Sequence, residues 1–192
     1  MKFKSELDLI EKVRVYINYY PGAERLNPKL HDIILEKARG YNFGAVMTSW
    51  NQGFFIKEFK IISDYVIKII KQNDTCRPPS PPWELELQDL WGQYYKKGDY
   101  QISHHHNPLH WSFCYYVNTP KKSYHLVFTN SNKKIFPKSG MIVLFPGYLK
   151  HHVPKHRGDG IRSIIGGNLF YNHENIDQTI MNISNLDQSH SI

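Results

Sequence analysis

Three consecutive histidines, His104, His105 and His106, are followed much later in the chain by His151 and then by Arg162. Imidazole is the commonest protein ligand for Fe, Cu, Ni and Zn. Side chains alternate across a β-strand, so the first and third of the consecutive histidines should point to the same side. A further histidine from a distant strand could then close one face of a metal ion and leave other positions open for small molecules. The arginine would add a fixed cation beside the metal, suited to a carboxylate.

The segment that contains His151 begins with five apolar residues, Met141–Phe145, which predict a buried strand. Pro146 and Gly147 then turn the chain, and His151 would lie on the next short strand. His152 would point the opposite way by alternation, so only one of these two histidines should be a ligand. We expect His151 to be the ligand, with His152 as the alternative.

Arg162 opens the last predicted strand, which runs through apolar residues to Phe170. A surface salt bridge would be an ordinary use of this arginine. However, a guanidinium at the start of an apolar strand next to the metal strand would be buried, and a buried cation needs an anion.

The second half of the chain reads as successive short strands separated by turn residues, which predicts a sandwich, jelly roll or barrel. The expected strands cover residues 85–95, 100–106, 111–117, 124–128, 141–145 and 162–170. The first half predicts a strand over 13–17 and two helices. One helix would start with Asn27 as N-cap and Pro28 at the first helical position and stop at Gly40, and the other would span 55–71.

We therefore expect one domain over residues 1–172, with helical support in 1–82 and a β-rich core in 83–172. The proline-rich stretch 77–82 would be a stiff connector, and residues 173–192 would be a surface helix or a loose tail. The fold class is mainly β with N-terminal α-helices.

Composition narrows the function classes. The net charge is +7, but Lys and Arg are scattered, so no basic tail marks a nucleic-acid binder, although nucleic acid is not excluded. Two cysteines, Cys76 and Cys114, cannot form a disulfide framework or a zinc knuckle. We find no signal peptide and no apolar run long enough for a membrane, so the expected location is the cytoplasm. The sequence contains no phosphate-binding glycine loop, no Ser/His/Asp arrangement and no paired-carboxylate motif. It does not indicate an oligomeric state.

Taken in order, these segments resemble the Fe(II)- and 2-oxoglutarate-dependent oxygenases, and more narrowly a group of small bacterial and phage proteins of that superfamily. The resemblance is strongest over residues 91–168 and extends over about 45–170. In that group a segment like Trp91–Tyr100 leads into His-x-His, followed by a Ser-Gly-x-Tyr-Tyr strand and a Leu-Phe-Pro-Ser-x-x-x-His-x-Val-Pro stretch. The matching segments here are Ser112–Val117, Leu144–Gly147, His151–Pro154, Arg162 and Gly166–Asn168.

The resemblance implies a double-stranded β-helix, that is, a cupin-like jelly roll with N-terminal helices packed on one sheet. It implies Fe(II) held by His104, His106 and His151. The co-substrate 2-oxoglutarate would bind through Arg162 and the hydroxyl of Tyr116, with Tyr94 as a further cofactor-binding residue. O2 would take the last open position. The implied reaction converts 2-oxoglutarate into succinate and CO2 and hydroxylates a small-molecule or peptidyl substrate.

One position departs from the pattern of most of the superfamily, which uses His-x-Asp or His-x-Glu. Here His106 stands in place of the carboxylate. Three neutral imidazoles would leave the metal more positive than usual. This ligand set leaves two alternatives open: a three-histidine cupin-type dioxygenase that needs no 2-oxoglutarate, or a catalytically inactive jelly-roll module that binds metal.

Overall fold

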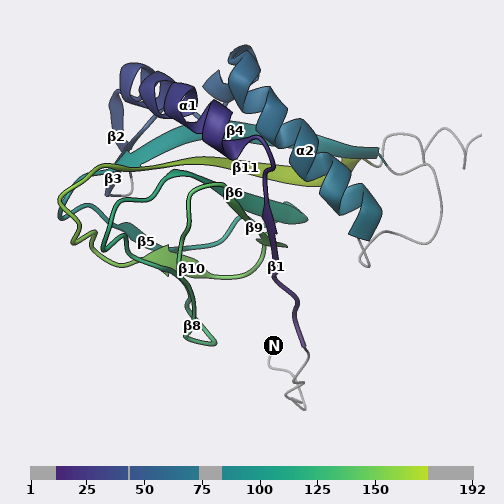
Figure 1. Ribbon diagram of the computed structural model, residues 1–192. Helices are drawn as coiled ribbons and strands as arrows, with labels where there is room; N and C mark the ends of the chain where they lie inside the picture. The colour runs from purple at the N-terminus through teal and green to yellow at the C-terminus, as the bar shows by residue number, and fades with distance from the viewer. Residues whose placement is uncertain (1–11, 43, 74–83, 173–192) are drawn as a thin grey trace, which may run out of the picture.

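The computed structural model describes residues 12–42, 44–73 and 84–172. Within these residues the chain forms two antiparallel β-sheets and two α-helices (Figure 1). No helix in these ranges is long and apolar enough to cross a membrane. The expected connector at 77–82 and the expected tail at 173–192 lie outside the described residues.

The larger sheet has seven strands in the order β1-β9-β6-β11-β4-β3-β2. Its centre is formed by the two long strands β4 and β11, which pair along almost their whole length and bring segments far apart in sequence side by side. The strands are β1 (Tyr16–Tyr19), β2 (Gly40–Asn42), β3 (Ala45–Met47), β4 (Glu84–Tyr95), β6 (Trp111–Asn118), β9 (Met141–Pro146) and β11 (Arg162–Asn172).

The smaller sheet has four short strands in the order β5-β10-β7-β8. They are β5 (Gln101–His104), β7 (Leu126–Phe128), β8 (Lys133–Ile135) and β10 (His151–Val153). The loop from β5 to β6 and the turn from β9 to β10 each connect a strand of one sheet to a strand of the other.

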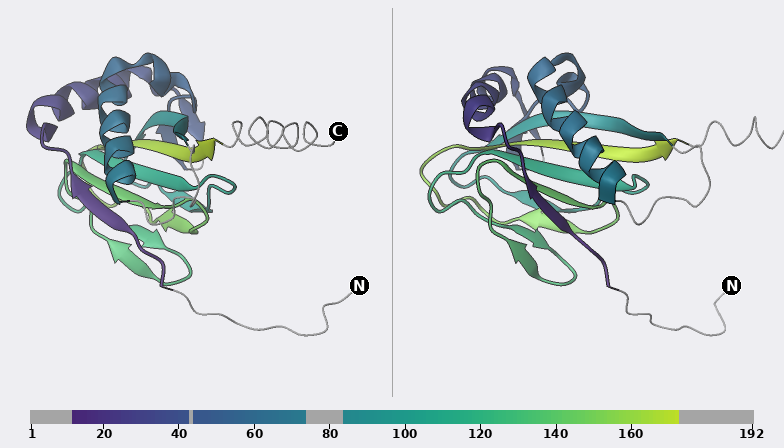
Figure 2. Two further views of the ribbon diagram at one scale, coloured as in Figure 1. Left: turned by 90° about the vertical axis from the view of Figure 1, so that its right-hand side faces the viewer. Right: turned by 45° about the vertical axis from the view of Figure 1, so that its right-hand side comes forward.

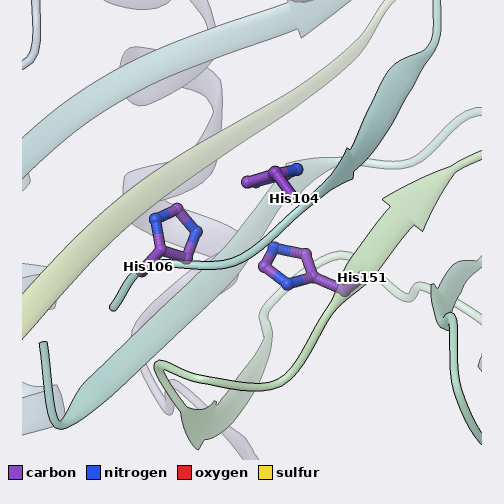
Figure 3. A group of neighbouring side chains, drawn as sticks. All are labelled: His104, His106 and His151. Carbon is purple, nitrogen blue, oxygen red and sulfur yellow. The ribbon is translucent and has the colours of Figure 1, made fainter. Parts of the chain in front are cut away.

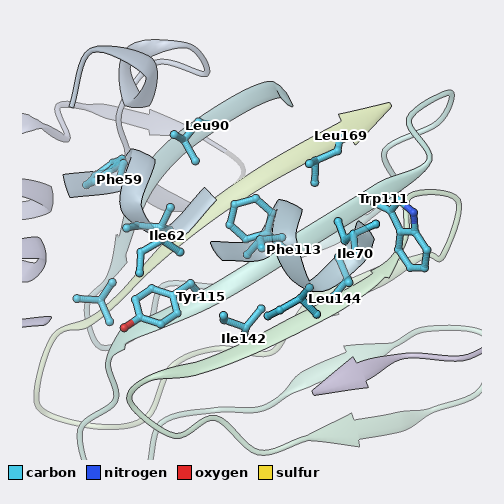
Figure 4. Packing of buried hydrophobic residues seen from close by; sticks show 14 of the residues in the cluster. Phe59, Ile62, Ile70, Leu90, Trp111, Phe113, Tyr115, Ile142, Leu144 and Leu169 are labelled. Atoms are coloured by element: carbon cyan, nitrogen blue, oxygen red, sulfur yellow. The ribbon is translucent and has the colours of Figure 1, made fainter. Parts of the chain in front are cut away.

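Helices α1 (Ala23–Lys37) and α2 (Lys57–Asn73), the second preceded by a short 3-10 turn at Gln52–Phe55, cover one face of the larger sheet (Figures 1 and 2). Their apolar faces meet that sheet in the larger hydrophobic cluster (Figure 4). Along β6, Phe113 and Tyr115 point into this cluster because every second side chain of a strand faces the same way.

The opposite face of the larger sheet meets the smaller sheet in a second cluster. Tyr116 alternates with Tyr115 and therefore lies between the sheets, together with Val143 and Phe145 of β9 and Phe128 of β7. The larger sheet is therefore buried on both faces, by the helices on one side and by the smaller sheet on the other.

The main strands agree with the expected ones within a few residues, whereas the first helix does not start where the sequence predicts. It begins at Ala23, so Asn27 is not its N-cap and Pro28 lies inside it. The Asn27 side chain instead accepts a hydrogen bond from the Tyr115 hydroxyl and donates one to the carbonyl of Val117. The Asn27 amide is thus bound to β6 and cannot cap a helix. Tertiary contacts with the sheet, and not the local Asn-Pro sequence, decide where this helix begins.

Candidate functional site

The structure brings His104, His106 and His151 together between the two sheets (Figure 3). His104 ends β5 and His151 begins β10, and the two residues are direct cross-strand partners. His106 reaches the group from the loop that follows β5. The ring centroids are 4.3 Å apart for His104 and His151, and 5.0 and 5.2 Å for the pairs with His106. One ring nitrogen of each residue lies within 4.8 Å of the other two.

Backbone carbonyls fix the tautomer of two of these rings. Nδ1 of His104 donates to the carbonyl of Ile102, and Nδ1 of His151 donates to the carbonyl of Leu149, each over 2.8 Å. A carbonyl can only accept, so Nδ1 must carry the proton and Nε2 is left with its lone pair. Metal-binding histidines commonly have their other ring nitrogen held in this way.

Burial keeps the three imidazoles neutral. Desolvation, with a smaller contribution from His104, lowers the pKa of His106 and of His151 to about 3. Desolvation also lowers the pKa of His104. At neutral pH all three rings are therefore lone-pair donors, which is the form that binds a metal ion.

The neighbouring histidines point elsewhere. His152 lies on the outer side of β10, where its Nδ1 and the hydroxyl of Thr129 are joined by a hydrogen bond over 3.0 Å. His105 is exposed, and its Nδ1 accepts from the amide of Asn107. The structure therefore brings His151, and not His152, into the histidine group.

Arg162, the first residue of β11, is only 1% exposed. Its guanidinium donates one hydrogen bond over 3.1 Å to the carbonyl of Tyr124. Among the described residues, no carboxylate forms a salt bridge with it, and its Nε has no hydrogen-bond partner. The structure thus confirms that the guanidinium is buried. A cation buried without a counter-ion is costly.

Two tyrosines and a cysteine surround this guanidinium. It lies 4.7 Å from the ring centroid of Tyr95 and 5.2 Å from that of Tyr116. The Tyr116 hydroxyl is buried, and the Cys114 thiol is the neighbour that interacts with it; no nitrogen or oxygen of the described residues is hydrogen-bonded to it. Burial raises the pKa of Tyr116 well above its usual value and that of Cys114 to about 11, so both keep their protons. The cluster therefore offers hydrogen-bond donors and one positive charge.

Tyr94, expected to bind the cofactor, faces away from this cluster. It is paired with Ser163 and packs in the helix-side core, whereas the adjacent Tyr95 is paired with Arg162 and lines the space between the sheets. Adjacent residues of a strand point to opposite faces of the sheet, so the side chains of Tyr94 and Tyr95 lie on different faces. Tyr95 replaces Tyr94 in the site.

One cavity connects the histidine group with Arg162. Two of its polar lining residues, Gln93 and Gln101, were not singled out from the sequence as parts of a site. Gln93 and Gln101 form a hydrogen bond over 3.0 Å that joins the two sheets inside the cavity. Trp50 and Trp91 lie edge to face, with centroids 4.7 Å apart, and Trp91 is also next to His106. Alternation along β4 could have indicated Gln93, but the cross-sheet contact with Gln101 depends on tertiary structure.

No family model matches this sequence, and no sequence relative was found among curated proteins. Solved structures do match. The viral collagen prolyl hydroxylase of Paramecium bursaria Chlorella virus 1, as a 2-oxoglutarate complex, aligns with a TM-score of 0.61 at 15% identity, covering 80% of this chain and 95% of that one. HygX of Streptomyces hygroscopicus, with nickel and 2-oxoglutarate bound, gives 0.61 at 11% identity, covering 82% and 83%.

A prolyl-4-hydroxylase of Pseudomonas putida aligns with a TM-score of 0.58 at 16% identity, covering 82% of this chain and 93% of that one. Identities this low speak for the fold alone. The alignments cover most of both chains. The chain therefore has a fold like that of the 2-oxoglutarate–Fe(II) oxygenases.

Proposed function

We propose that this protein is an Fe(II)- and 2-oxoglutarate-dependent dioxygenase. The overall reaction would convert substrate, 2-oxoglutarate and O2 into hydroxylated substrate, succinate and CO2. The observation that carries the proposal is the buried Arg162, which has no acidic partner among the described residues, in the same cavity as three neutral histidines. A metal site alone would not need such a cation.

The donor set fits a divalent transition metal. With Nδ1 protonated, Nε2 of His104 and of His151 carries the lone pair that would coordinate the metal, and His106 would supply the third nitrogen. Imidazole suits iron, and three ligands on one side leave open positions for small molecules. When bound, the iron would supply the centre at which O2 is reduced and 2-oxoglutarate loses CO2.

The other end of the cavity fits a carboxylate. Arg162 would bind the distal carboxylate of 2-oxoglutarate through a charge-assisted hydrogen bond, and the Tyr116 hydroxyl would donate a second one. The co-substrate would thereby satisfy two buried groups that have unused hydrogen-bonding capacity, Arg162 Nε and Tyr116 Oη. Such pairing offsets the cost of the buried charge, which is several kcal/mol.

The rest of the site would position these groups and exclude water. We interpret the two sheets as the two halves of a double-stranded β-helix, or jelly roll, with the cavity between them. Tyr95, Phe145 and Trp91 give the cavity apolar walls. A low-polarity environment strengthens the interaction between the guanidinium and a carboxylate. The prime substrate would be a small molecule or a peptidyl group.

The test combines binding with turnover. Anaerobic calorimetry with Mn(II)-loaded protein should show 2-oxoglutarate binding, and Fe(II)-loaded protein in air should form succinate and CO2 from 2-oxoglutarate, even slowly without a prime substrate. Tyr94→Phe serves as a matched control, because this tyrosine lies on the other face of β4. If neither binding nor decarboxylation occurs with metal-loaded protein, the proposal is wrong.

A second candidate follows from the ligand set itself. Because His106 stands where a carboxylate is usual, the site could act as a three-histidine dioxygenase that needs no keto acid. The same preparation distinguishes the two functions. Oxygen consumption with a thiol or diketone substrate in the absence of 2-oxoglutarate would favour the second candidate.

A further inference from the structure

The three histidines are held in two different ways. The rings of His104 and His151 are each fixed by a hydrogen bond from Nδ1 to a backbone carbonyl two residues earlier. His106 lies beyond the end of β5, and among the described residues neither of its ring nitrogens has a hydrogen-bond partner. The ring of His106 packs against Trp91 and the other two histidines, but no hydrogen bond orients it, so any hydrogen bonds that position this residue must come from its backbone.

The backbone of His106 is tied to the turn that leads to His151. The His106 amide donates to the carbonyl of Gly147 over 2.7 Å, and the Gly147 amide donates to the carbonyl of His110 over 3.0 Å. We call these two hydrogen bonds the Gly147 clasp. The amide of Leu109 closes the loop by donating to the carbonyl of His106 over 2.8 Å. The clasp thus joins the loop that carries one ligand to the turn that precedes another.

The clasp has no room for a side chain at position 147. A Cβ added to Gly147 would lie 2.1 Å from the carbonyl oxygen of Leu109 and 3.0 Å from its carbonyl carbon. Contacts below 3.0 Å essentially never occur for a real Cβ, so this oxygen would have to retreat by 0.9 Å (3.0 minus 2.1). The obstructing atoms belong to the backbone, so relief requires the loop itself to move. A displacement of this size would move His106 away from the metal position.

We propose that Gly147 is a positioning residue for the third metal ligand. The clasp presets His106 beside His104 and His151, so that the three-histidine site exists before any metal binds. Two ligands are oriented through their rings, and the third is oriented through its backbone. This inference rests on the proposed metal site, but it concerns how this chain builds that site.

The direct test is Gly147→Ala, probed with Co(II) as the metal. We expect Co(II) affinity to fall by about 10- to 100-fold, the range typical for groups that orient metal ligands. The visible spectrum of bound Co(II) and the number of metal-shifted imidazole N–H signals should match those of His106→Ala. The matched control is Gly40→Ala, because a Cβ there meets only Met47 O at 3.7 Å. This control should bind Co(II) as the wild type does.

A double-mutant cycle separates positioning from general destabilisation. Once His106 is absent, Gly147→Ala should cause no additional loss of Co(II) affinity, because there is no third ligand left to misplace. An equal loss in both backgrounds, or an unchanged three-imidazole spectrum in Gly147→Ala, would overturn the proposal. Thermal unfolding of each variant shows whether the protein is folded.

If Gly147→Ala does not fold, amide hydrogen exchange on the metal-free wild type decides the question. The clasp predicts that the amides of His106 and Gly147 are protected before metal is added. Exchange of the His106 amide at the rate of a free loop would contradict it. If the wild type binds no divalent metal at all, the proposed function fails, whereas amide protection still reports on the clasp.

Discussion

At one end of the cavity, three neutral imidazoles present nitrogen lone pairs, whereas at the other end Arg162 presents hydrogen-bond donors, with the ring of Tyr116 beside its guanidinium. The histidine end is suited to a cation and the arginine end to an anion. Burial lowers the pKa of His106 and His151 to about 3 and raises that of Cys114 to about 11, so at neutral pH these imidazoles are neutral and the thiol keeps its proton. This difference between the two ends fits a ligand that coordinates a metal with one end and carries a carboxylate at the other. Substitutions can remove binding at each end separately.

The largest effect should come from the histidine end. We expect His151→Ala to abolish measurable Co(II) binding, because it removes a ligand whose Nε2 is free and whose ring is already oriented. Isothermal titration with Co(II) measures this. His152→Ala is the matched control, since that side chain lies on the outer side of β10. Retained binding in His151→Ala, or its loss in His152→Ala, would show that the metal site has been assigned to the wrong residues.

Arg162→Met should break the other end only. Removing one partner of a buried, hydrogen-bonded charge pair costs about 2–5 kcal/mol, so 2-oxoglutarate affinity should fall by roughly 30- to 5000-fold. Co(II) affinity without 2-oxoglutarate should stay unchanged, because Arg162 does not belong to the histidine group. Calorimetry with each ligand in turn checks both statements, and a variant that binds 2-oxoglutarate normally would refute this role of Arg162.

The same variant should affect stability in the opposite direction. Without co-substrate, Arg162 is buried and lacks an acidic partner among the described residues, so an apolar replacement should be neutral or stabilise the fold by about 1–4 kcal/mol. With both proteins saturated with Mn(II), adding 2-oxoglutarate should raise the unfolding temperature of the wild type but not that of Arg162→Met. Chemical denaturation with and without ligand measures this difference. Strong destabilisation of ligand-free Arg162→Met would mean that the contacts of Arg162 with the Tyr124 carbonyl and the two tyrosine rings outweigh the cost of its buried charge.

Tyr116→Phe should have a smaller effect. Losing one hydrogen bond to a charged group costs about 1.5–3 kcal/mol, so 2-oxoglutarate should bind roughly 10- to 150-fold more weakly. Tyr94→Phe removes the same hydroxyl from the opposite face of the larger sheet and should leave binding unchanged. Equal effects of the two substitutions would contradict the placement of the cavity on one face of that sheet.

The smallest effect concerns the thiol beside Arg162. Because burial raises the pKa of Cys114 to about 11, only about one molecule in a thousand carries the reactive thiolate at pH 8. In a Cys76→Ser background, alkylation should therefore be slow and should accelerate about tenfold per pH unit until the pH approaches 11. Bound 2-oxoglutarate should slow it further. Fast alkylation at pH 7 would show that this end of the cavity is more open or more polar than described.

The sequence alone was sufficient to predict those site residues whose role follows from their residue type and their position along a strand. The alternation that separates His151 from His152 is a local property, as is the start of an apolar strand at Arg162. His106 joins His104 for a different reason than the sequence predicted, because β5 ends at His104 and His106 lies in the loop that follows. The same reasoning placed Tyr94 in the site, whereas the side chain of Tyr95 faces it. Adjacent residues of a strand point to opposite faces, so an error of one residue along β4 selects the wrong tyrosine. It also placed Asn27 at a helix start, where the contact with Tyr115 decides instead.

Other parts of the site have no local signal. The hydrogen bond between Gln93 and Gln101 joins two sheets, and the clasp at Gly147 depends on where the carbonyl of Leu109 lies. Both arise from the meeting of segments that are distant in sequence. Strands as short as β2, β3 and β8 were missed for a related reason, since three residues are too few to show a period.

The most direct measurement is an anaerobic crystal structure of the protein soaked with Fe(II) and 2-oxoglutarate. We expect iron on the three histidines, with Nε2 of His104 and His151 as ligands, and the distal carboxylate of 2-oxoglutarate hydrogen-bonded to Arg162 and Tyr116. A single ligand would then connect the two ends of the cavity. Iron on these histidines with Arg162 still without an anion, or 2-oxoglutarate bound outside the cavity, would contradict this account.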